Sequence, residues 1–495
     1  MSPAVAVAGA GPVGLMLACE LSVAGVEVVV LERSPEPRRD ALGMAINATV
    51  VELLHQRGLM DGLRPHGLSW PAAHFAHIPL DPARLTGRRE NNFIVPQARL
   101  ERRLEERAAE LGIEVRRGTE VVGLSQDGTG VTVRVRTSGG AEDEPVRAAY
   151  LVGCDGADST VRSLAGIGFP GEDLPFHGIT GDLPATDALS AWFGAHQLDR
   201  GMFTVAPSAP GVLRVSTGEF GVEPADAAAP AGVAELRDAA RRLTGRDLDL
   251  PEPHWLARWG HRTRQAERYR DGRVLLAGDA AHVIFPLGGQ ALSTGIEDAV
   301  NLAWKLAAAL RGDAPAGLLD TYEAERHPVA ARARRTTLAQ SALMHPMDRI
   351  APLRELFAEL VELPQVNEFL VDMAAARDVR YAFGPDHPLV GGRLPDVPLT
   401  TASGGIGLAG TLHAARGVLL VLGDGDAPAE EAAGWAGRVD VVRAAPSAEI
   451  DATALLLRPD GRVAWAAGDG GAAGLRDALA AWFGDPVPAG AQGRL

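Results

Sequence analysis

The sequence predicts an α/β fold built around a Rossmann-like parallel sheet, and three observations support this prediction. Residues 5–32 contain an apolar strand, a glycine-rich turn, an apolar helix and a second apolar strand. Two later apolar strands lead into Asp155-Gly156 and into Gly278-Asp279. Short, continuous apolar runs of this kind are typical of strands that are buried on both faces of a parallel sheet.

The turn after the first strand has the spacing G-x-G-x-x-G, formed by Gly9, Gly11 and Gly14. In such a turn the first glycine permits a tight bend, the second admits a pyrophosphate, and the third lets helix and strand pack closely. Glu32 follows 18 residues after the third glycine, where a carboxylate would accept the ribose hydroxyls. The turn predicts a dinucleotide site, but it does not choose between NAD(P) and FAD, and Arg33 leaves NADP open.

Glycine stands beside an acidic residue at two further strand ends, those at Asp155 and Asp279. NAD(P) is held mainly by one strand–helix–strand unit, whereas a ligand that touches all three strand ends would explain the recurrence. The pattern therefore favours FAD. A helix is predicted to begin near Thr294, and its positive N-terminal end would attract an anionic group of the ligand.

The composition argues against several classes of protein. The 495 residues suffice for two or three domains, and the formal net charge of −15 without a basic stripe argues against a nucleic-acid surface. No run of 18 apolar residues occurs, so no membrane span is expected. Cys19 and Cys154 lie in apolar segments, as expected of buried thiols in a cytoplasmic protein. No zinc-ligand set or catalytic triad emerges, and His282 is interpreted as a structural residue.

Taken together, these motifs resemble the FAD-dependent aromatic hydroxylases, which are single-component flavoprotein monooxygenases, and especially the branch that acts on bacterial aromatic polyketides. The matching segments are GAGPVG at 9–14, LER at 31–33, VPQ at 95–97, GCDGADSTVR at 153–162, GRVLLAGDAAH at 272–282, PLGGQ at 286–290 and DAVNLAWKL at 298–306. The resemblance covers nearly the whole chain. It implies that FAD carries the chemistry, with NADPH as a transient co-substrate and O2 as the source of oxygen.

The resemblance also implies the cofactor-binding residues. It places Asp279 at the ribityl chain, Asp155 near the flavin and pyrophosphate, and Gln97 with the Val121 backbone near the ribose and adenine. Residues 286–292 are expected at the isoalloxazine edge. The predicted set is Gly9, Gly11, Pro12, Val13, Gly14, Glu32, Arg33, Gln97, Val121, Asp155, Asp279, Pro286, Gly288, Gly289, Ala291 and Leu292.

Two groups of residues depart from the family pattern. Ala291 and Ser293 stand where relatives commonly have glycine and asparagine, and Leu42 and Thr49 stand where relatives usually have arginines. One of those arginines typically holds the FAD phosphates or the nicotinamide cofactor, and a lost charge-assisted bond costs about 1.5–3 kcal/mol. Arg38 or Arg39 could substitute for it. The departures bear on reduction by NADPH more than on the fold.

The order of these segments divides the chain into domains, and the resemblance implies that the last of them is thioredoxin-like. The region 175–258 is expected to be rich in coil, with short strands such as 212–217, and the long helix near 318–344 is expected to be broken or entered at Pro328. A hairpin is predicted around Pro459-Asp460-Gly461. The predicted domains are an FAD-binding domain over 1–175 and 260–345, an inserted β-rich substrate domain over 176–259, a helical connector over 346–387, and a thioredoxin-like domain without a cysteine pair over 388–495.

The predicted function is FAD-dependent oxygenation of an aromatic polyketide, by ring hydroxylation or by Baeyer–Villiger insertion. The alternative is a flavin-fold protein with altered or lost redox turnover that binds or rearranges a polyketide. A flavin halogenase is disfavoured, because Lys305 is the only lysine and lies in the flavin-domain helix. The C-terminal domain is expected to serve packing or homodimer contacts.

Overall fold

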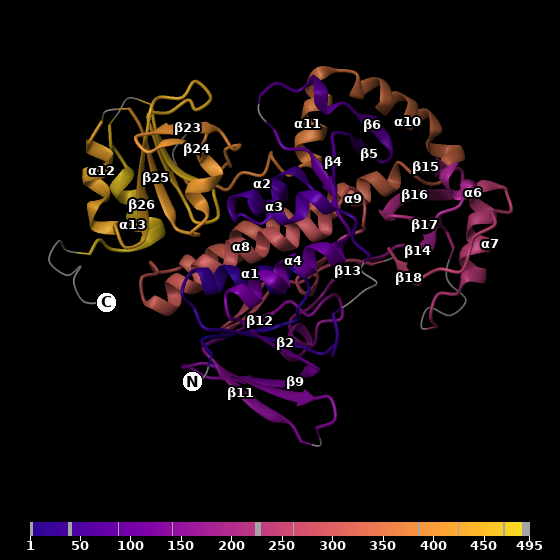
Figure 1. Ribbon diagram of the computed structural model, residues 1–495, viewed down its shortest axis with the longest axis horizontal. Coiled ribbons are helices and arrows are strands. Elements are labelled where there is room, and N and C mark those ends of the chain that lie inside the picture. The colour runs from indigo at the N-terminus through magenta and orange to yellow at the C-terminus, as the bar shows by residue number, and fades with distance from the viewer. Residues whose placement is uncertain are drawn as a thin grey trace.

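The computed structural model describes residues 3–37, 42–87, 89–140, 142–222, 229–260, 262–384, 387–423, 425–468 and 471–487. Figure 1 shows a central body flanked by an antiparallel sheet on one side and by the C-terminal region on the other. None of the helices in these ranges is both long enough and apolar enough to cross a membrane. The residues Arg38 and Arg39 lie outside the described ranges.

The central body is organised around a six-stranded sheet with the order β20-β21-β12-β1-β2-β8. All neighbouring strands run parallel except the edge pair β20–β21. Because β1, β2, β12 and β21 run in the same direction, the glycine-rich turn, Glu32, Asp155 and Asp279 lie at one edge. The predicted parallel sheet is confirmed. The strands are β1 (Val5–Ala8), β2 (Val28–Glu32), β8 (Glu114–Arg117), β12 (Tyr150–Gly153), β20 (Arg270–Asp271) and β21 (Val274–Leu276).

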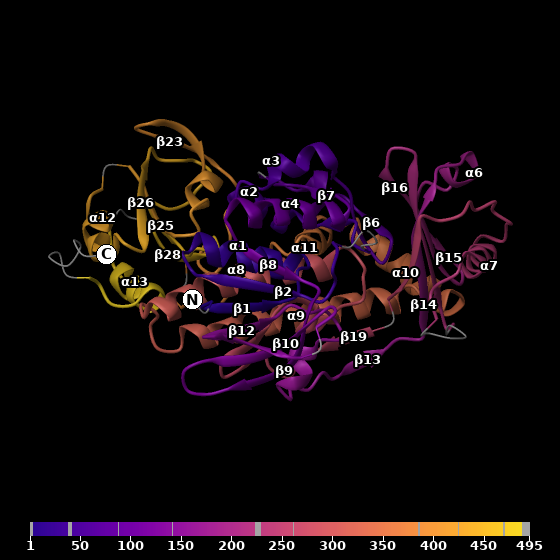
Figure 2. The same cartoon turned by 60° about the horizontal axis from the view of Figure 1, so that its bottom comes forward.

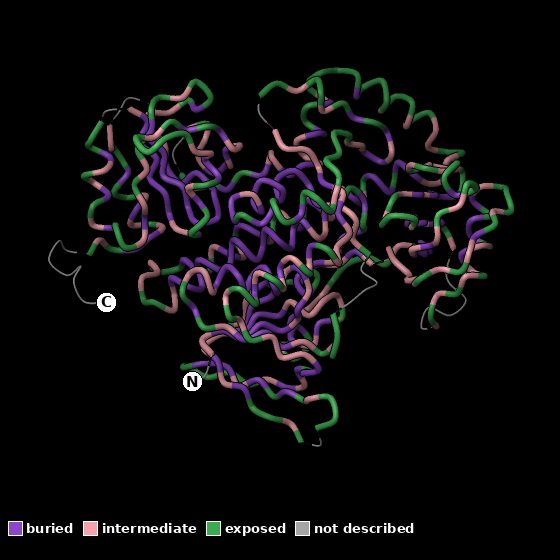
Figure 3. The backbone as a smooth tube through the Cα atoms, in the orientation of Figure 1, coloured by how far each residue is buried: buried purple, intermediate pink, exposed green. Residues whose placement is uncertain are grey.

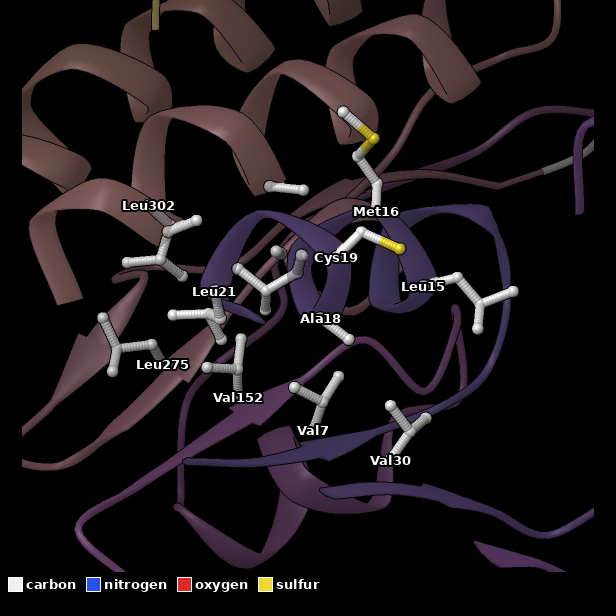
Figure 4. Close-up of a cluster of buried hydrophobic side chains, with 14 of the residues drawn as sticks. Val7, Leu15, Met16, Ala18, Cys19, Leu21, Val30, Val152, Leu275 and Leu302 are labelled. Carbon is white, nitrogen blue, oxygen red and sulfur yellow. The ribbon is translucent and has the colours of Figure 1, made fainter. Parts of the chain in front are cut away.

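Two helices, α1 (Pro12–Val23) and α8 (Gln290–Arg311), form the core over this sheet. Figure 4 shows Leu15, Ala18 and Leu21 of α1 above Val7 and Val152, with Leu302 of α8 beside them. Since α1 is enclosed by the sheet, by α8 and by α4 (Gln97–Glu110), it is apolar on nearly all sides. Figure 3 shows the resulting concentration of buried backbone in the central body. Burial of this apolar surface is the main force that holds the helix in place.

The chain leaves the parallel sheet three times before it completes it, and the third excursion, between β12 and β20, contains a five-stranded antiparallel sheet. Between β2 and β8 it forms a three-stranded sheet, the β5–β6 hairpin and short helices, and between β8 and β12 it forms the antiparallel sheet β11-β10-β9. The elements are β3 (Ala45–Ile46), α2 (Ala48–Gln56), α3 (Met60–Leu63), β4 (Leu68–Trp70), β5 (Ala73–Phe75), β6 (Ile78–Leu80), β7 (Asn92–Ile94), β9 (Thr119–Gln126), β10 (Val131–Thr137), β11 (Glu144–Ala148) and α5 (Thr160–Leu164).

The region after α5 forms a five-stranded antiparallel sheet with the order β15-β16-β17-β14-β18. The expectation of a coil-rich region with short strands was wrong, because β14, β16 and β17 have nine residues each. Glycine and proline are frequent here, but cross-strand pairing outweighs their low strand propensity. The elements are β13 (Gly171–Asp173), β14 (Phe176–Pro184), α6 (Asp187–Ser190), β15 (Gly194–Leu198), β16 (Gly201–Ala209), β17 (Val212–Phe220), α7 (Val233–Thr244), β18 (Trp255–Trp259), β19 (Arg262–Gln265) and β22 (His282–Val283).

Two helix boundaries differ from the predictions. Helix α8 begins at Gln290 rather than near Thr294, since Gly289 with φ 69° already turns the chain into the helix. Helix α9 (Thr321–Ala342) runs through Pro328 without a break. A proline removes one backbone donor and crowds the preceding turn, but the surrounding packing retains the helix. The helices α10 (Met347–Val361) and α11 (Pro364–Ala374) follow and pack beside the β5–β6 hairpin (Figure 2).

The C-terminal region contains a four-stranded sheet with the order β26-β25-β27-β28. Strands β25 and β26 are parallel and the other pairs are antiparallel, an order that is compatible with a thioredoxin-like domain. The predicted hairpin around Asp460 is confirmed by the pairing of β27 with β28. The elements are β23 (Pro398–Thr401), β24 (Gly404–Gly407), β25 (Gly417–Leu422), α12 (Ala427–Glu431), β26 (Val439–Ala444), β27 (Ala454–Leu457), β28 (Val463–Ala467) and α13 (Leu475–Phe483).

The turn of this hairpin is joined to α8 and α9 by a buried group of ion pairs, which we name the Arg458 cluster. It comprises Arg458, Asp460, Glu325, Asn301 and Lys305, all of which are buried. Arg458 donates to both carboxylate oxygens of Glu325 at 2.7 and 2.8 Å. Lys305 donates to the same Glu325 at 2.9 Å and to Asn301 at 2.8 Å. Polar contacts without water between them thus bind the C-terminal region to the central helices.

The Lys305 ammonium makes the stability of the protein depend on pH. Burial lowers its pKa to about 7, although Glu325 opposes the shift. An unfolded chain keeps this proton up to about pH 10.4, so between the two values the unfolded state binds the extra proton and rising pH favours folding. We expect the unfolding free energy of the wild type, relative to Lys305→Met, to increase from pH 7 to pH 9.5. Urea titrations at both pH values measure this difference, and a difference that stayed constant would contradict the lowered pKa.

Candidate active site

The carboxyl-end edge of the parallel sheet opens into one large cavity of about 1020 Å³. Its walls come from the glycine-rich turn, the ends of β2, β12 and β21, the start of α8, and the antiparallel sheet around β16 and β17. All of the predicted cofactor-binding residues line this cavity except Gly14. The cavity is therefore long enough to join the three strand-end motifs to the antiparallel sheet.

The three glycines of the first turn have different surroundings. A Cβ atom on Gly14 would lie 2.0 Å from the Gly9 carbonyl oxygen, so Gly14 serves close packing and not the cavity. Gly9 has φ 104°, and its Cβ would lie 2.3 Å from the Cys154 carbonyl oxygen. A Cβ on Gly11 would meet no atom within 4 Å. Gly11 thus leaves bare backbone facing open space at the start of α1, as a phosphate group requires.

The first turn of α1 presents unpaired backbone donors to that space. Its N-cap, Gly11, has no side chain to accept them, and no acidic residue lies in the first turn. Free N–H groups at a helix N-terminus attract an anion. Glu32 closes the other side, because its two carboxylate oxygens accept the N–H groups of Ala10 and Ser34 at 2.7 and 2.8 Å. These bonds hold the carboxylate at the end of β2.

Asp155 and Arg162 organise the second strand end. Asp155 accepts a hydrogen bond from the Ser159 hydroxyl at 2.5 Å and another from the Val161 backbone at 3.0 Å, which fixes the start of α5. Arg162 donates to the carbonyls of Ala157 and Ala280, both at 2.9 Å. The guanidinium therefore joins the second strand end to the third. The neighbouring Cys154 was predicted to be buried, but it is half-buried and lines the cavity.

Asp279 follows the third strand, and Asp298 of α8 lies beside it; the pKa of the first carboxyl is raised and that of the second is lowered. The accessible surface of Asp279 faces the cavity, and burial within the surrounding protein raises its pKa, opposed by His282. Burial would also raise the pKa of Asp298, but His282 and Arg326 hold it below its usual range. The Asp298 carboxylate contacts His282 Nε2 at 2.7 Å and accepts from Arg326 Nε at 2.7 Å. His282 is thus a structural partner of Asp298, while Asp279 is the carboxyl group available to a ligand.

The start of α8 forms the inner end of the cavity. Gly288 and Gly289 have φ values of 67° and 69°, and a Cβ on Gly288 would lie in open space. No acidic residue lies in the first turn of α8. Ser293 is buried and does not line the cavity; its hydroxyl accepts the Asn47 backbone N–H at 3.1 Å, which ties α8 to the start of α2. The helix start can therefore stabilise negative charge in the cavity through its dipole and free N–H groups.

Leu42 and Thr49, the two positions where the family resemblance implies arginine, face different surroundings. The Leu42 side chain is 44% exposed and lines the cavity, and its carbonyl oxygen accepts from Arg214 Nη1 at 3.2 Å. Thr49 is 1% exposed, and its hydroxyl donates to the Ala375 carbonyl at 2.6 Å. An arginine at 42 could reach the cavity, whereas an arginine at 49 would need the contact with Ala375 to open.

The antiparallel sheet supplies the opposite wall, and none of the residues that line it was predicted from the sequence. Strand register places Thr204, Ser216 and Thr180 side by side, and the hydroxyls of Ser216 and Thr180 lie 2.6 Å apart. Arg214 lies two residues from Ser216 on the same face and pairs with Asp182 at 2.7 Å. The period-two alternation in residues 202–206 and 214–218, around the turn at 210–211, was the signal that could have identified this wall.

Comparison with known proteins identifies the family to which this chain belongs. Residues 3–337 match the FAD binding domain family, and residues 387–486 match the family described as "Aromatic-ring hydroxylase, C-terminal". The chain belongs to the FAD-dependent monooxygenase family. Among the curated members, 12-dehydrotetracycline 5-monooxygenase/anhydrotetracycline 6-monooxygenase of Streptomyces rimosus is 46% identical over 98% of this chain and 99% of its own. The family of this chain is therefore shown along nearly its full length.

The FAD-dependent monooxygenase family also contains relatives whose names describe other reactions. Dialkyldecalin synthase of Streptomyces rugosporus is 52% identical over 98% of this chain and 99% of its own.

Among solved structures, the anhydrotetracycline hydroxylase of Streptomyces rimosus superposes with a TM-score of 0.91 at 45% identity, covering 98% of this chain and 100% of its own. A Diels-Alderase of pyrroindomycin biosynthesis superposes with a TM-score of 0.87 at 51% identity, covering 97% of this chain and 99% of its own.

Proposed function

We propose that the protein is an FAD-dependent monooxygenase that oxygenates a polyketide, with NADPH as its transient co-substrate. The observation that carries this proposal is the single cavity, which extends from the glycine-rich turn to the antiparallel sheet and is lined by residues of all three strand-end motifs. A cavity of about 1020 Å³ is at the upper end of the range for small-molecule sites, as a dinucleotide with a substrate beside it requires.

The residues around the first and second strand ends fit the adenosine diphosphate half of FAD. Gly11 leaves room for the pyrophosphate, and the free N–H groups of α1 would neutralise its charge. Glu32 would accept the ribose hydroxyls from its fixed position at the end of β2. Gln97 begins α4, accepts from the Gly43 N–H at 3.2 Å and lines the cavity, as does Val121.

The residues around the third strand end fit the flavin half. Asp279 would accept hydroxyls of the ribityl chain, and residues Pro286 to Leu292 would border the ring system. When bound, FAD supplies the capacity to take up hydride from NADPH and to activate O2. The N-terminus of α8 would stabilise negative charge at the ring, and the surrounding walls would exclude water from the substrate side.

A polyketide would lie between the flavin and the antiparallel sheet. The hydroxyl row of Thr204, Ser216 and Thr180 offers hydrogen bonds to ring oxygens, while Met202 and Trp259 offer apolar contact on the same wall. The related enzymes named above for anhydrotetracycline act on a compound of this class. The proposal places the reaction in the cytoplasm, where NADPH is available.

A second candidate is a rearrangement of a polyketide without redox turnover, with FAD as a bound structural group. Two features favour it: the exposed Leu42 stands on the cavity wall where the family resemblance implies an arginine, and the chain is 52% identical to a protein named dialkyldecalin synthase. Anaerobic mixing of the flavin-loaded protein with NADPH separates the two candidates. Loss of the flavin absorbance within seconds supports the monooxygenase, whereas flavin that stays oxidised over minutes supports the rearrangement.

The substitution Leu42→Arg should strengthen the interaction with NADPH about tenfold. The position is 44% exposed and lines the cavity, so an arginine can form one charge-assisted bond to a phosphate, worth ~1.5 kcal/mol or more. Stopped-flow measurement of flavin reduction against NADPH concentration gives the apparent affinity. Leu42→Met is the matched control, because methionine is also a long, unbranched side chain but carries no charge. Equal affinities in both variants would show that position 42 does not contact NADPH.

A further inference from the structure

The β5–β6 hairpin contains an unfavourable turn beside the cavity. Phe75 pairs with Ile78, so the loop consists of Ala76 and His77 alone. Their φ values are 51° and 61°, in the left-handed region. Two-residue hairpin loops with both φ values positive strongly prefer Asn-Gly or Asp-Gly, because side chains with a Cβ are disfavoured there. This chain instead places an alanine and a histidine at these positions.

Side chains from two helices, α9 and α10, hold the strained turn in place. The Ala76 N–H donates to Gln340 of α9 at 3.0 Å, and the Ala76 carbonyl accepts from Arg354 of α10 at 2.7 Å. The His77 N–H donates to His74 Nδ1 at 3.4 Å. Unfavourable backbone that is over-determined by its surroundings is found most often at functional sites. In Figure 1 the hairpin lies beside α10 and α11, next to the antiparallel sheet.

The His77 imidazole is neutral, and its proton can be assigned. Burial lowers its pKa to about 3, with His74 and Arg354 adding to the shift. His77 Nδ1 is sealed from solvent and has no hydrogen-bond partner among the described residues. A buried N–H without an acceptor is costly, so the single proton belongs on Nε2. His77 also lines the large cavity. In the described part of the chain its Nε2–H has no protein acceptor, so it can donate to a ligand in that cavity.

We propose that His77 is a substrate-positioning residue, whose Nε2–H donates a hydrogen bond to a carbonyl or phenol oxygen of the polyketide. The inference rests on the proposed polyketide site, but it holds for oxygenation and for rearrangement alike. It explains why the chain keeps a histidine where glycine or asparagine would relieve the turn. In addition to the hydroxyl row of the sheet, the cavity thereby gains a polar group of fixed direction.

The test is equilibrium binding of anhydrotetracycline to the FAD-loaded protein without NADPH, followed by fluorescence. This probe is a fused-ring polyketide that carries carbonyl and phenol oxygens. His77→Gly removes the donor and relieves the turn, Ala76→Gly relieves the turn and keeps the donor, and His77→Gln places an amide N–H near the position of Nε2. Melting temperatures of all variants are measured in parallel, because a merely structural role for His77 predicts loss of stability and not of binding.

We expect His77→Gly to melt at or above the wild-type temperature and to bind the probe at least tenfold more weakly. Ala76→Gly and His77→Gln should bind within threefold of the wild type. Equal affinity of wild type and His77→Gly would overturn the inference, and so would the absence of probe binding to the wild type. Neither result depends on flavin reduction, so the NADPH experiment tests the proposed oxygenation separately.

Discussion

Replacing Arg458 with alanine is expected to lower the free energy of unfolding by about 3–5 kcal/mol, because it leaves two buried carboxylates without their main partner. The guanidinium is fully buried, donates to Glu325 and Asp460, and lies 4.5 Å from the ring centres of Phe383 and Trp482. Arg458 holds the pKa of Asp460 well below its usual range, although burial alone would raise it. Urea unfolding followed by tryptophan fluorescence measures the change.

The matched control for this prediction is Arg443→Ala. Arg443 lies in the same C-terminal sheet and pairs with Asp426 at 2.7 Å, but its side chain is 46% exposed. An exposed pair of this kind is worth about 1 kcal/mol or less. If Arg458→Ala and Arg443→Ala cost the same small amount, the Arg458 cluster does not hold the C-terminal region against the central helices.

Replacing Asp279 with alanine should weaken FAD binding between tenfold and a hundredfold. A hydrogen bond to a charged group contributes about 1.5–3 kcal/mol, and the carboxyl of Asp279 is the group that the third strand end directs into the cavity. Titration of FAD into the apoprotein, followed by flavin fluorescence, gives the affinity. Asp158→Ala is the control, because Asp158 also lines the cavity but its side chain is 78% exposed and paired with Arg262.

The unfolding temperature of the apoprotein tests whether Asp279 also has a structural role. Asp279 is exposed to the cavity, but the protein that surrounds the cavity desolvates its carboxyl and raises the pKa, so ionising it at neutral pH opposes folding. Above the ordinary aspartate pKa, Asp279→Ala should therefore melt at or above the wild-type temperature, and this advantage should vanish once acid protonates the carboxyl in both states. A variant that loses FAD and also melts much lower would indicate a structural role.

The sequence was most informative where covalent geometry and periodicity leave few choices. The turn of Gly9, Gly11 and Gly14 between two apolar strands predicted the centre of the parallel sheet, which the register of β1 with β2 confirms. Helix boundaries were less reliable, because tertiary packing overrides local signals. Pro328 lies inside α9, and α8 starts as soon as Gly289 allows it.

The β5–β6 hairpin beside the cavity could not be predicted from the sequence for a different reason. The β5–β6 hairpin lacks the glycine or asparagine that marks a two-residue turn, so its conformation depends on Gln340 and Arg354 from distant helices. The two arginine departures were equally ambiguous: only the folded chain shows that Leu42 faces the cavity while Thr49 bonds to Ala375.

The burial of Lys305 has a practical consequence for chemical labelling. The sequence contains no other lysine, and this one is 0% exposed within the Arg458 cluster. Its pKa of about 7 leaves much of the amine unprotonated and therefore nucleophilic at neutral pH. Because this amine is fully buried, however, a succinimidyl ester would not reach it while the protein stays folded. The rate of acylation at this one position would then report how often the C-terminal region separates from the central helices.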